Sequence, residues 1–149
     1  PEGVTQLAVD SIFMMPQLGV LANVHPQAAA QVFERDCLIP LGTCIAPVGN
    51  GRDGEPCLRV TVQNTEITVP FGTIHLIPMA EGTVAEARLE PARGFDVGAG
   101  RGRTLATQVK GGAVGLIIDC RGRPIRLPKD PNARRAKIDH WERALGARG

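Results

Sequence analysis

The sequence predicts an α+β protein: a mostly antiparallel, barrel-like β domain flanked by an N-terminal strand and helices and by a C-terminal helix. Short apolar and β-branched segments recur at about eight- to twelve-residue spacing between residues 37 and 128, as in sandwiches and barrels. The 18 glycines and 12 prolines supply turns between such segments. Helical patterns lie outside this region. Closure into a barrel leaves no exposed edge, so it is the architecture expected for strands this short.

The first 36 residues form a separate α/β pattern. Residues 4–9 predict a strand that Asp10 and Ser11 end, and two helices follow over residues 16–24 and 26–33. Each helix begins at a proline, which suits a first helical turn. One strand cannot bury both faces alone, so the strand at 4–9 is expected to find partners in later strands or in a sheet outside this chain. Because the sequence starts at Pro1 without Met, we expect a piece of a longer or processed polypeptide.

Residues 37–128 form the predicted β domain. The expected strands are 37–47, 57–63, 66–71, 73–79, 83–90, 103–110, 113–119 and 123–127. Three hairpins are expected between them. Asn64 and Thr65 form the turn of the first, and Gly111 and Gly112 join the arms of the second. The turn of residues 119–122 leads into the return strand of the third.

The last predicted segment, residues 129–149, is a C-terminal helix. Asp130 is expected to cap it and Pro131 to occupy its first turn. The residues expected to face a core are Ala133, Ile138, Trp141 and Leu145. The residues expected to form a basic outer face are Arg134, Arg135, Lys137 and Arg143.

Charge and cysteine usage narrow the function classes. The net charge is only +2, and aromatic residues make up 3% of the chain, which argues against a nucleic-acid-binding protein. The four cysteines form no Cys-x-x-Cys pair and the three histidines are scattered, so we expect no metal and no cofactor. Reduced thiols indicate a cytoplasmic protein. The sequence shows no signal peptide and no apolar stretch of membrane-spanning length.

The candidate site lies in two arginine- and glycine-rich turns. Residues 93–126 hold seven basic and two acidic residues. The residues expected to bind an anion or a partner are Arg101, Arg103, Asp119, Arg121 and Arg123. If the glycine pair makes a hairpin, the two turns lie at the same end of the barrel and the arginines converge. The alternative is structural: a glycine-rich loop with solvated arginines, and an Asx-turn with an ion pair.

Several stretches resemble one known family. They are DSIFMMPQLGVLANVHPQAA, VFERDCLIPLGTCIAPVG, FDVGAGRGR and VGLIIDCRGRP, and they follow one another over nearly the whole chain. Together they resemble the C-terminal region of the glutamate mutase MutL family, actin/Hsp70-like ATPases that share only a name with mismatch-repair proteins. The resemblance implies that residues 1–36 end the ATPase core and that residues 37–128 are an appended β domain. It implies, as partners, the rest of a longer chain or an ATPase core, together with an adenosylcobalamin-dependent mutase that the protein helps to reactivate or assemble.

Three functions follow as hypotheses. The first is a non-catalytic accessory domain of a MutL-type ATPase, since the chain has neither a phosphate-cradling turn that leads into a helix nor a nucleophile elbow around Ser11, its one serine. The second is a small ligand- or anion-binding barrel with its site at the arginine turns, which leaves catalysis open. The third is nucleic-acid binding.

Overall fold

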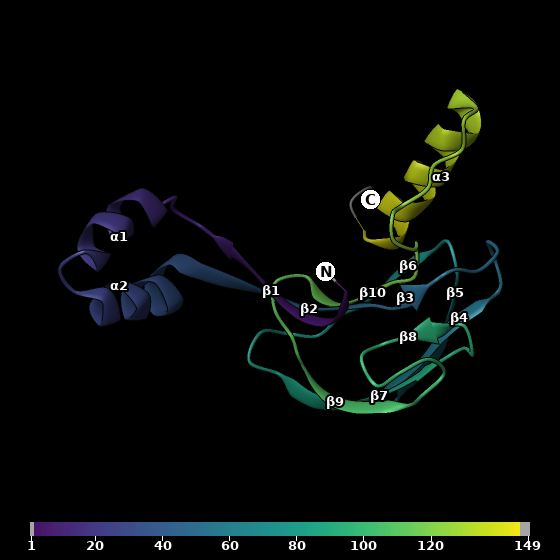
Figure 1. Ribbon diagram of the computed structural model, residues 1–149, viewed down its shortest axis with the longest axis horizontal. Helices are drawn as coiled ribbons and strands as arrows, with labels where there is room; N and C mark the ends of the chain where they lie inside the picture. The colour runs from purple at the N-terminus through teal and green to yellow at the C-terminus, as the bar shows by residue number, and fades with distance from the viewer. Residues whose placement is uncertain (1, 147–149) are drawn as a thin grey trace.

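A computed structural model describes residues 2–146 and confirms the α+β class (Figure 1). The strands are β1 (Gly3–Asp10), β2 (Leu38–Ala46), β3 (Val48–Gly49), β4 (Pro56–Val62), β5 (Thr65–Pro70), β6 (Ile74–Ile77), β7 (Val84–Pro91), β8 (Phe95–Asp96), β9 (Leu105–Lys110) and β10 (Gly115–Asp119). The helices are α1 (Met15–Ala22), α2 (Pro26–Val32), the short π-helical turn η1 (Phe33–Cys37) and α3 (Pro131–Ala144). The structure contains both predicted N-terminal helices, the strand predicted at residues 4–9 and seven of the eight strands predicted within residues 37–128, each within a few residues of its expected bounds.

The β domain is built from two four-stranded sheets, and the expectation of a closed barrel is wrong. One sheet has the order β1-β2-β10-β6 and the other β5-β4-β7-β9, so each sheet keeps two edge strands among the described residues. All pairings are antiparallel except that of β10 with β2. The small ribbon β3-β8 is separate. Figure 1 shows β1, β2, β10 and β6 lying across from β7 and β9.

The core lies between the two sheets. Ile45, Leu116 and Ile118 of one sheet are fully buried, and they belong to the same apolar cluster as Val60 and Leu89 of the other. In β4 and β7 buried positions alternate with more exposed ones, as period-two side-chain alternation requires. The core is largely aliphatic, and Phe95 is buried within it.

The predicted glycine hairpin does not form. β9 pairs with β7, and β10 pairs with β2 and β6, so residues 111–114 carry the chain from one sheet to the other. A Cβ on Gly112 would stand 2.4 Å from the carbonyl carbon of Leu41, and one on Gly111 would stand 2.0 Å from the carbonyl oxygen of Ala80. The two glycines therefore allow one backbone segment to pack directly on another where the chain crosses between the sheets, instead of forming a hairpin turn.

Two other turn predictions need correction. Val62 pairs with Thr65, so the turn between β4 and β5 consists of Gln63 and Asn64, one residue earlier than predicted. The predicted return strand at 123–127 is absent: after Cys120 the chain makes a tight turn, and residues 123–127 belong to no strand. Pro124, which lacks an N–H to donate, follows this turn directly.

The N-terminal segment forms an arm. β1 pairs with β2 over its whole length, from Gly3 opposite Ala46 to Asp10 opposite Leu38. This two-stranded ribbon leads away from the β domain and ends in α1 and α2, which stand apart from it (Figure 1). β1 thus finds a partner in a later strand on one side, while its other edge has no partner within residues 2–146. Residues 3–10 share a sheet with residues 38–46. The domain boundary predicted between residues 36 and 37 therefore does not coincide with a break between sheets, and it stays a prediction.

Helix α3 rests on the β domain through one buried side chain, that of Trp141. The predicted cap is confirmed, since Asp130 accepts a hydrogen bond from the Ala133 N–H at 2.7 Å and Pro131 occupies the first turn. Ala133 is exposed, however, and Lys137 is half-buried, so the predicted faces of the helix are only partly right. Residues 147–149 of the predicted C-terminal segment, like Pro1, lie outside the described residues. Between residues 2 and 146, no helix combines the length and apolarity needed to cross a membrane.

Candidate functional site

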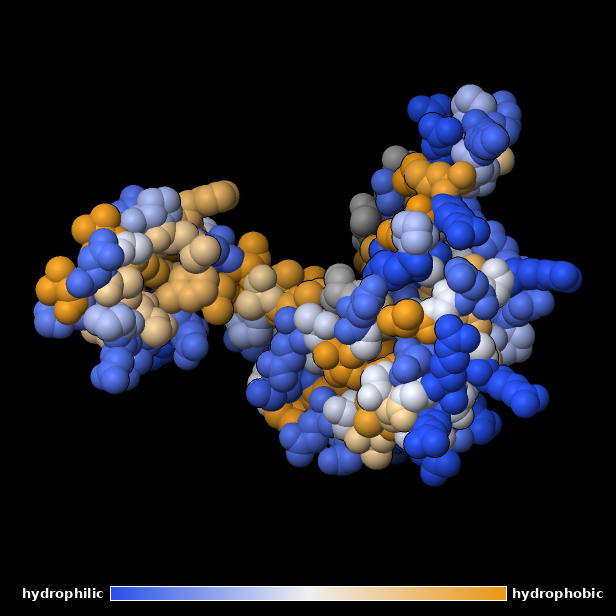
Figure 2. Space-filling model, in the orientation of Figure 1, coloured by the Kyte–Doolittle hydropathy of each residue, from blue (hydrophilic) through white to orange (hydrophobic). Residues whose placement is uncertain are grey.

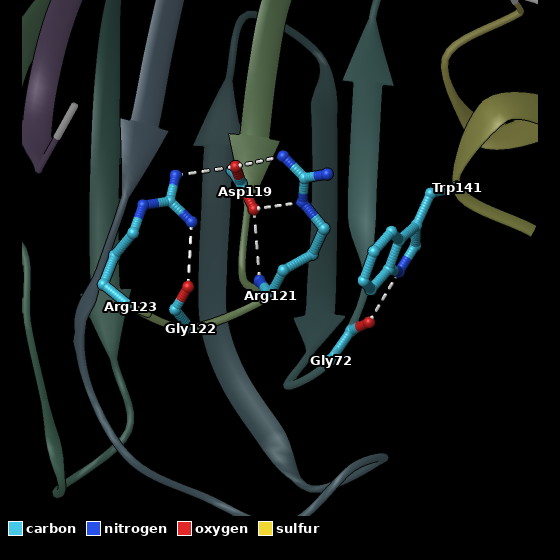
Figure 3. Close-up of polar contacts among 6 residues, drawn as sticks. All are labelled: Gly72, Asp119, Arg121, Gly122, Arg123 and Trp141. Atoms are coloured by element: carbon cyan, nitrogen blue, oxygen red, sulfur yellow. Dashed lines mark hydrogen bonds and ion pairs between the residues drawn. The ribbon is translucent and has the colours of Figure 1, made fainter. Parts of the chain in front are cut away.

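The structure brings three of the five predicted site residues together at the end of β10. The Asp119 carboxylate accepts hydrogen bonds from Arg121 Nε at 2.8 Å and Nη2 at 2.7 Å, and from Arg123 Nη2 at 2.8 Å. It also accepts the backbone N–H of Arg121 at 3.2 Å. Figure 3 shows the two guanidiniums on opposite sides of the carboxylate. We call Asp119, Arg121 and Arg123 the Asp119 triad.

A tight turn allows this arrangement. Gly122 adopts φ +86°, and a Cβ there would stand 2.9 Å from the ring of Phe71. A left-handed residue between the two arginines turns the chain, so both side chains can reach back to Asp119. Arg123 Nη1 also donates to the Gly122 carbonyl at 2.9 Å. This is the Asx-turn with an ion pair that the sequence spacing suggested as the alternative to a binding site.

Asp119 is charged at neutral pH. Its burial, at 4% exposure, would raise the pKa, but the hydrogen bonds from Arg121 and Arg123 outweigh this and lower the pKa to about 2. A carboxylate with this pKa and four hydrogen bonds is poorly suited to act as a general acid or base near pH 7. The triad is therefore a rigid ion-pair cluster carrying one excess positive charge.

Helix α3 extends the site with residues that the sequence did not assign to it. The Trp141 indole Nε1 donates to the Gly72 carbonyl at 2.8 Å (Figure 3), and the Arg121 guanidinium carbon lies 5.0 Å from the centre of the Trp141 ring. Lys137 forms an ion pair with Asp53 and lies 5.7 Å from the same ring. Lys137 and Trp141 are four residues apart, the spacing that places two side chains on one helix face. This spacing is the one feature of the sequence that could have indicated that Lys137 and Trp141 lie at the same site.

Arg101 and Arg103 belong to a different loop. Both are exposed, in the connection between β8 and β9. No hydrogen bond or ion pair within residues 2–146 joins them to the Asp119 triad. Asp96 organises their loop by accepting the backbone N–H groups of Gly98 at 2.7 Å and Gly100 at 2.9 Å, which lowers the pKa of Asp96.

The cysteines are placed for packing. All four are unpaired and buried. In Cys120 the contact with Cys57, followed by burial and the charge of Asp119, raises the thiol pKa, so it stays protonated and is not an activated nucleophile. Among the described residues no group of three or more His, Cys, Asp or Glu could hold a metal ion.

Comparison with known proteins found no matching family model, no similar curated protein and no similar solved structure.

Proposed function

We propose that this chain is a non-catalytic interaction domain that docks on another protein through its α1–α2 arm. The resemblance described above supports a MutL-type ATPase core as the occupant of that arm, either in the same longer chain or in a separate protein. We further propose that the assembly is cytoplasmic, needs no cofactor in this domain, and supports reactivation or assembly of an adenosylcobalamin-dependent mutase.

The observation that carries the proposal is the apolar surface of the helical part of the arm, residues 11–33, which has no Lys, Arg, Asp or Glu. Phe13 is 85% exposed, Val20 and Val24 are each 70% exposed, and Met15 is 60% exposed. From Ser11 to Phe33 the chain contains no Lys, Arg, Asp or Glu. Figure 2 shows apolar residues gathered over this part of the molecule. Apolar side chains concentrated on an uncharged projection are typical of an interaction site.

The helices of the arm also lack an adequate core of their own. α1 and α2 have eight and seven residues, and each buries one residue, Leu18 and Ala29 respectively. Their main contacts within residues 2–146 are with each other and with η1. Isolated helices shorter than about 12–15 residues are marginal in water. A partner that covers the arm would supply the apolar contacts that stabilise it.

The chemistry of the arm favours a protein over other partners. A nucleic acid requires Lys and Arg at the contact, and helices that lie on a membrane surface usually carry them on their polar face. The arm has none between residues 11 and 33. The Asp119 carboxylate accepts four hydrogen bonds from Arg121 and Arg123, which supports a non-catalytic role for the rest of the domain.

The test is binding between this chain and a purified MutL-type ATPase core, measured by titration calorimetry. The variant Phe13→Ser/Val20→Gln/Val24→Gln changes the arm. The control Val84→Gln/Val114→Gln changes two exposed valines of the β domain, at 54% and 37% exposure. We expect the arm variant to weaken binding at least about tenfold, since three apolar contacts are lost, and the control to bind like the wild type.

Failure of the wild-type chain to bind the ATPase core, or equal losses in both variants, would contradict the proposal. Light scattering of the chain alone provides a second check. A homodimer that the arm variant abolishes would show that the occupant of the arm is a second copy, and would overturn the assignment to an ATPase core.

A further inference from the structure

A cavity of about 310 Å³ lies beside the Asp119 triad and shares one residue, Arg121, with the site that the sequence predicted. Its walls come from the loop at residues 50–53, from Phe71, from the connection between β10 and α3, and from α3 itself. Three cationic side chains line it, those of Arg121, Arg126 and Lys137, with Asp53 as the one carboxylate. Arg123 points to the other side of Asp119 and is not part of the lining.

The charges around this cavity are not balanced. Asp119 compensates one of the two arginines that it binds, and Asp53 compensates Lys137. Arg126 forms no ion pair with any residue between 2 and 146. The cavity and its ion pairs therefore carry two positive charges in excess. A phosphate monoester, at about −1.5 to −2 near pH 7, matches this excess.

The guanidinium of Arg121 is held in place before any ligand arrives. Asp119 fixes its Nε and Nη2, and the Trp141 ring lies beside it. Its Nη1 makes no hydrogen bond within the described chain, and the side chain is 21% exposed. An arginine whose rotamer is already fixed loses little entropy when it binds an oxyanion. Lys137 is similarly held by Asp53, at 20% side-chain exposure.

The remaining walls indicate what the anion is attached to. Phe71, Pro124 and Leu127 give the cavity an apolar side. Its volume is at the small end of the range of about 300–1,000 Å³ found for small-molecule pockets. We propose that this cavity binds the phosphate monoester of a small organic molecule, with Arg121, Arg126 and Lys137 on the phosphate and Phe71 against the organic group.

The experiment is an NMR titration of the ¹⁵N-labelled chain with phenyl phosphate, and separately with inorganic phosphate, at constant ionic strength. The amides of Gly51 and Gly122, both in the cavity wall, are the reporters. We expect saturable shifts at these amides, with tighter binding of phenyl phosphate than of inorganic phosphate. Arg126→Gln should weaken binding by about tenfold, the loss expected for one charge-assisted hydrogen bond. Arg103→Gln, which removes an exposed arginine elsewhere, should bind like the wild type.

Three results would overturn the proposal. Shifts that do not saturate would exclude a defined site. Equal weakening by Arg126→Gln and Arg103→Gln would mean that the general positive field attracts the anion. Equal affinity for the two ligands would refute the role of the apolar wall, and with it an organic phosphate as the ligand. Because the arm lies outside the cavity, none of these results depends on the proposed docking function.

Discussion

Replacing Asp119 by Asn should destabilise the protein strongly near neutral pH and should remove part of its acid sensitivity. The substitution keeps the shape of the side chain but removes the charge that compensates Arg121 and Arg123. Breaking a fully buried ion pair costs about 3–5 kcal/mol. Since each arginine side chain is 21% exposed, solvent can screen part of the uncompensated charge, and we expect a loss of roughly 2–3 kcal/mol in the free energy of unfolding.

The pH dependence follows from the lowered pKa of Asp119. Its pKa is about 2 in the folded protein against an ordinary value of 3.8. This difference corresponds to ~2.5 kcal/mol of stability. Because the folded-state pKa is the lower one, this stability is fully present above about pH 5 and is lost as the pH falls through 4 toward 2.

Urea unfolding followed by far-UV circular dichroism at several pH values from 7 to 2.5 measures both effects. The difference between the wild type and Asp119→Asn should be largest at pH 7 and should shrink below about pH 4. Asp36→Asn is the control, since Asp36 pairs with Arg35 at the surface, at 48% and 82% exposure. A difference below about 0.5 kcal/mol at pH 7, the size of an ordinary surface substitution, or one that stays constant over the whole pH range, would refute the reasoning.

Three further substitutions test how the elements are held together. Trp141→Phe keeps an aromatic ring but loses the hydrogen bond to the Gly72 carbonyl, and should cost ~1–2 kcal/mol; an unchanged urea midpoint would show that α3 is anchored by other contacts. Gly112→Ala should cost more than about 2 kcal/mol, because its Cβ would stand 2.4 Å from the carbonyl carbon of Leu41, and a thermal midpoint equal to that of the wild type would contradict the crossover geometry. Asp130→Ala should cost ~1 kcal/mol by removing the helix cap; helix content that is unaffected in circular dichroism melts would argue against a capping role.

Local chemistry could be predicted from the sequence. Short apolar and β-branched segments predicted β4 and β7 as strands, and proline at the start of α1 and α2 helped to place these helices. Asp130 before Pro131 predicted the start of α3, which the hydrogen bond to Ala133 confirms. Each of these features depends on residues close together in the chain, where spacing and side-chain type are sufficient.

Features that depend on distant residues could not be predicted in this way. Gly111 and Gly112 suit a hairpin turn and a backbone crossover equally well, and the contacts with Leu41 and Ala80 decide for the crossover. The two sheets form an open sandwich and not a closed barrel because β9 pairs with β7 while β10 pairs with β2 and β6. No local sequence pattern encodes these partners.

The candidate site also has a local part, which could be predicted, and a part that depends on residues far apart in the sequence. The reach of Arg121 and Arg123 to Asp119 could be predicted from the sequence, because successive members of the triad are two residues apart and Gly122 separates the two arginines. That Trp141 and Lys137 join them, while Arg101 and Arg103 do not, depends on how distant segments pack in the folded protein. Those contacts form when α3 packs beside Gly72 and Asp53, which lie far from α3 in the sequence. The surfaces that α3 packs against exist only after both sheets have formed, so no local pattern predicts these contacts.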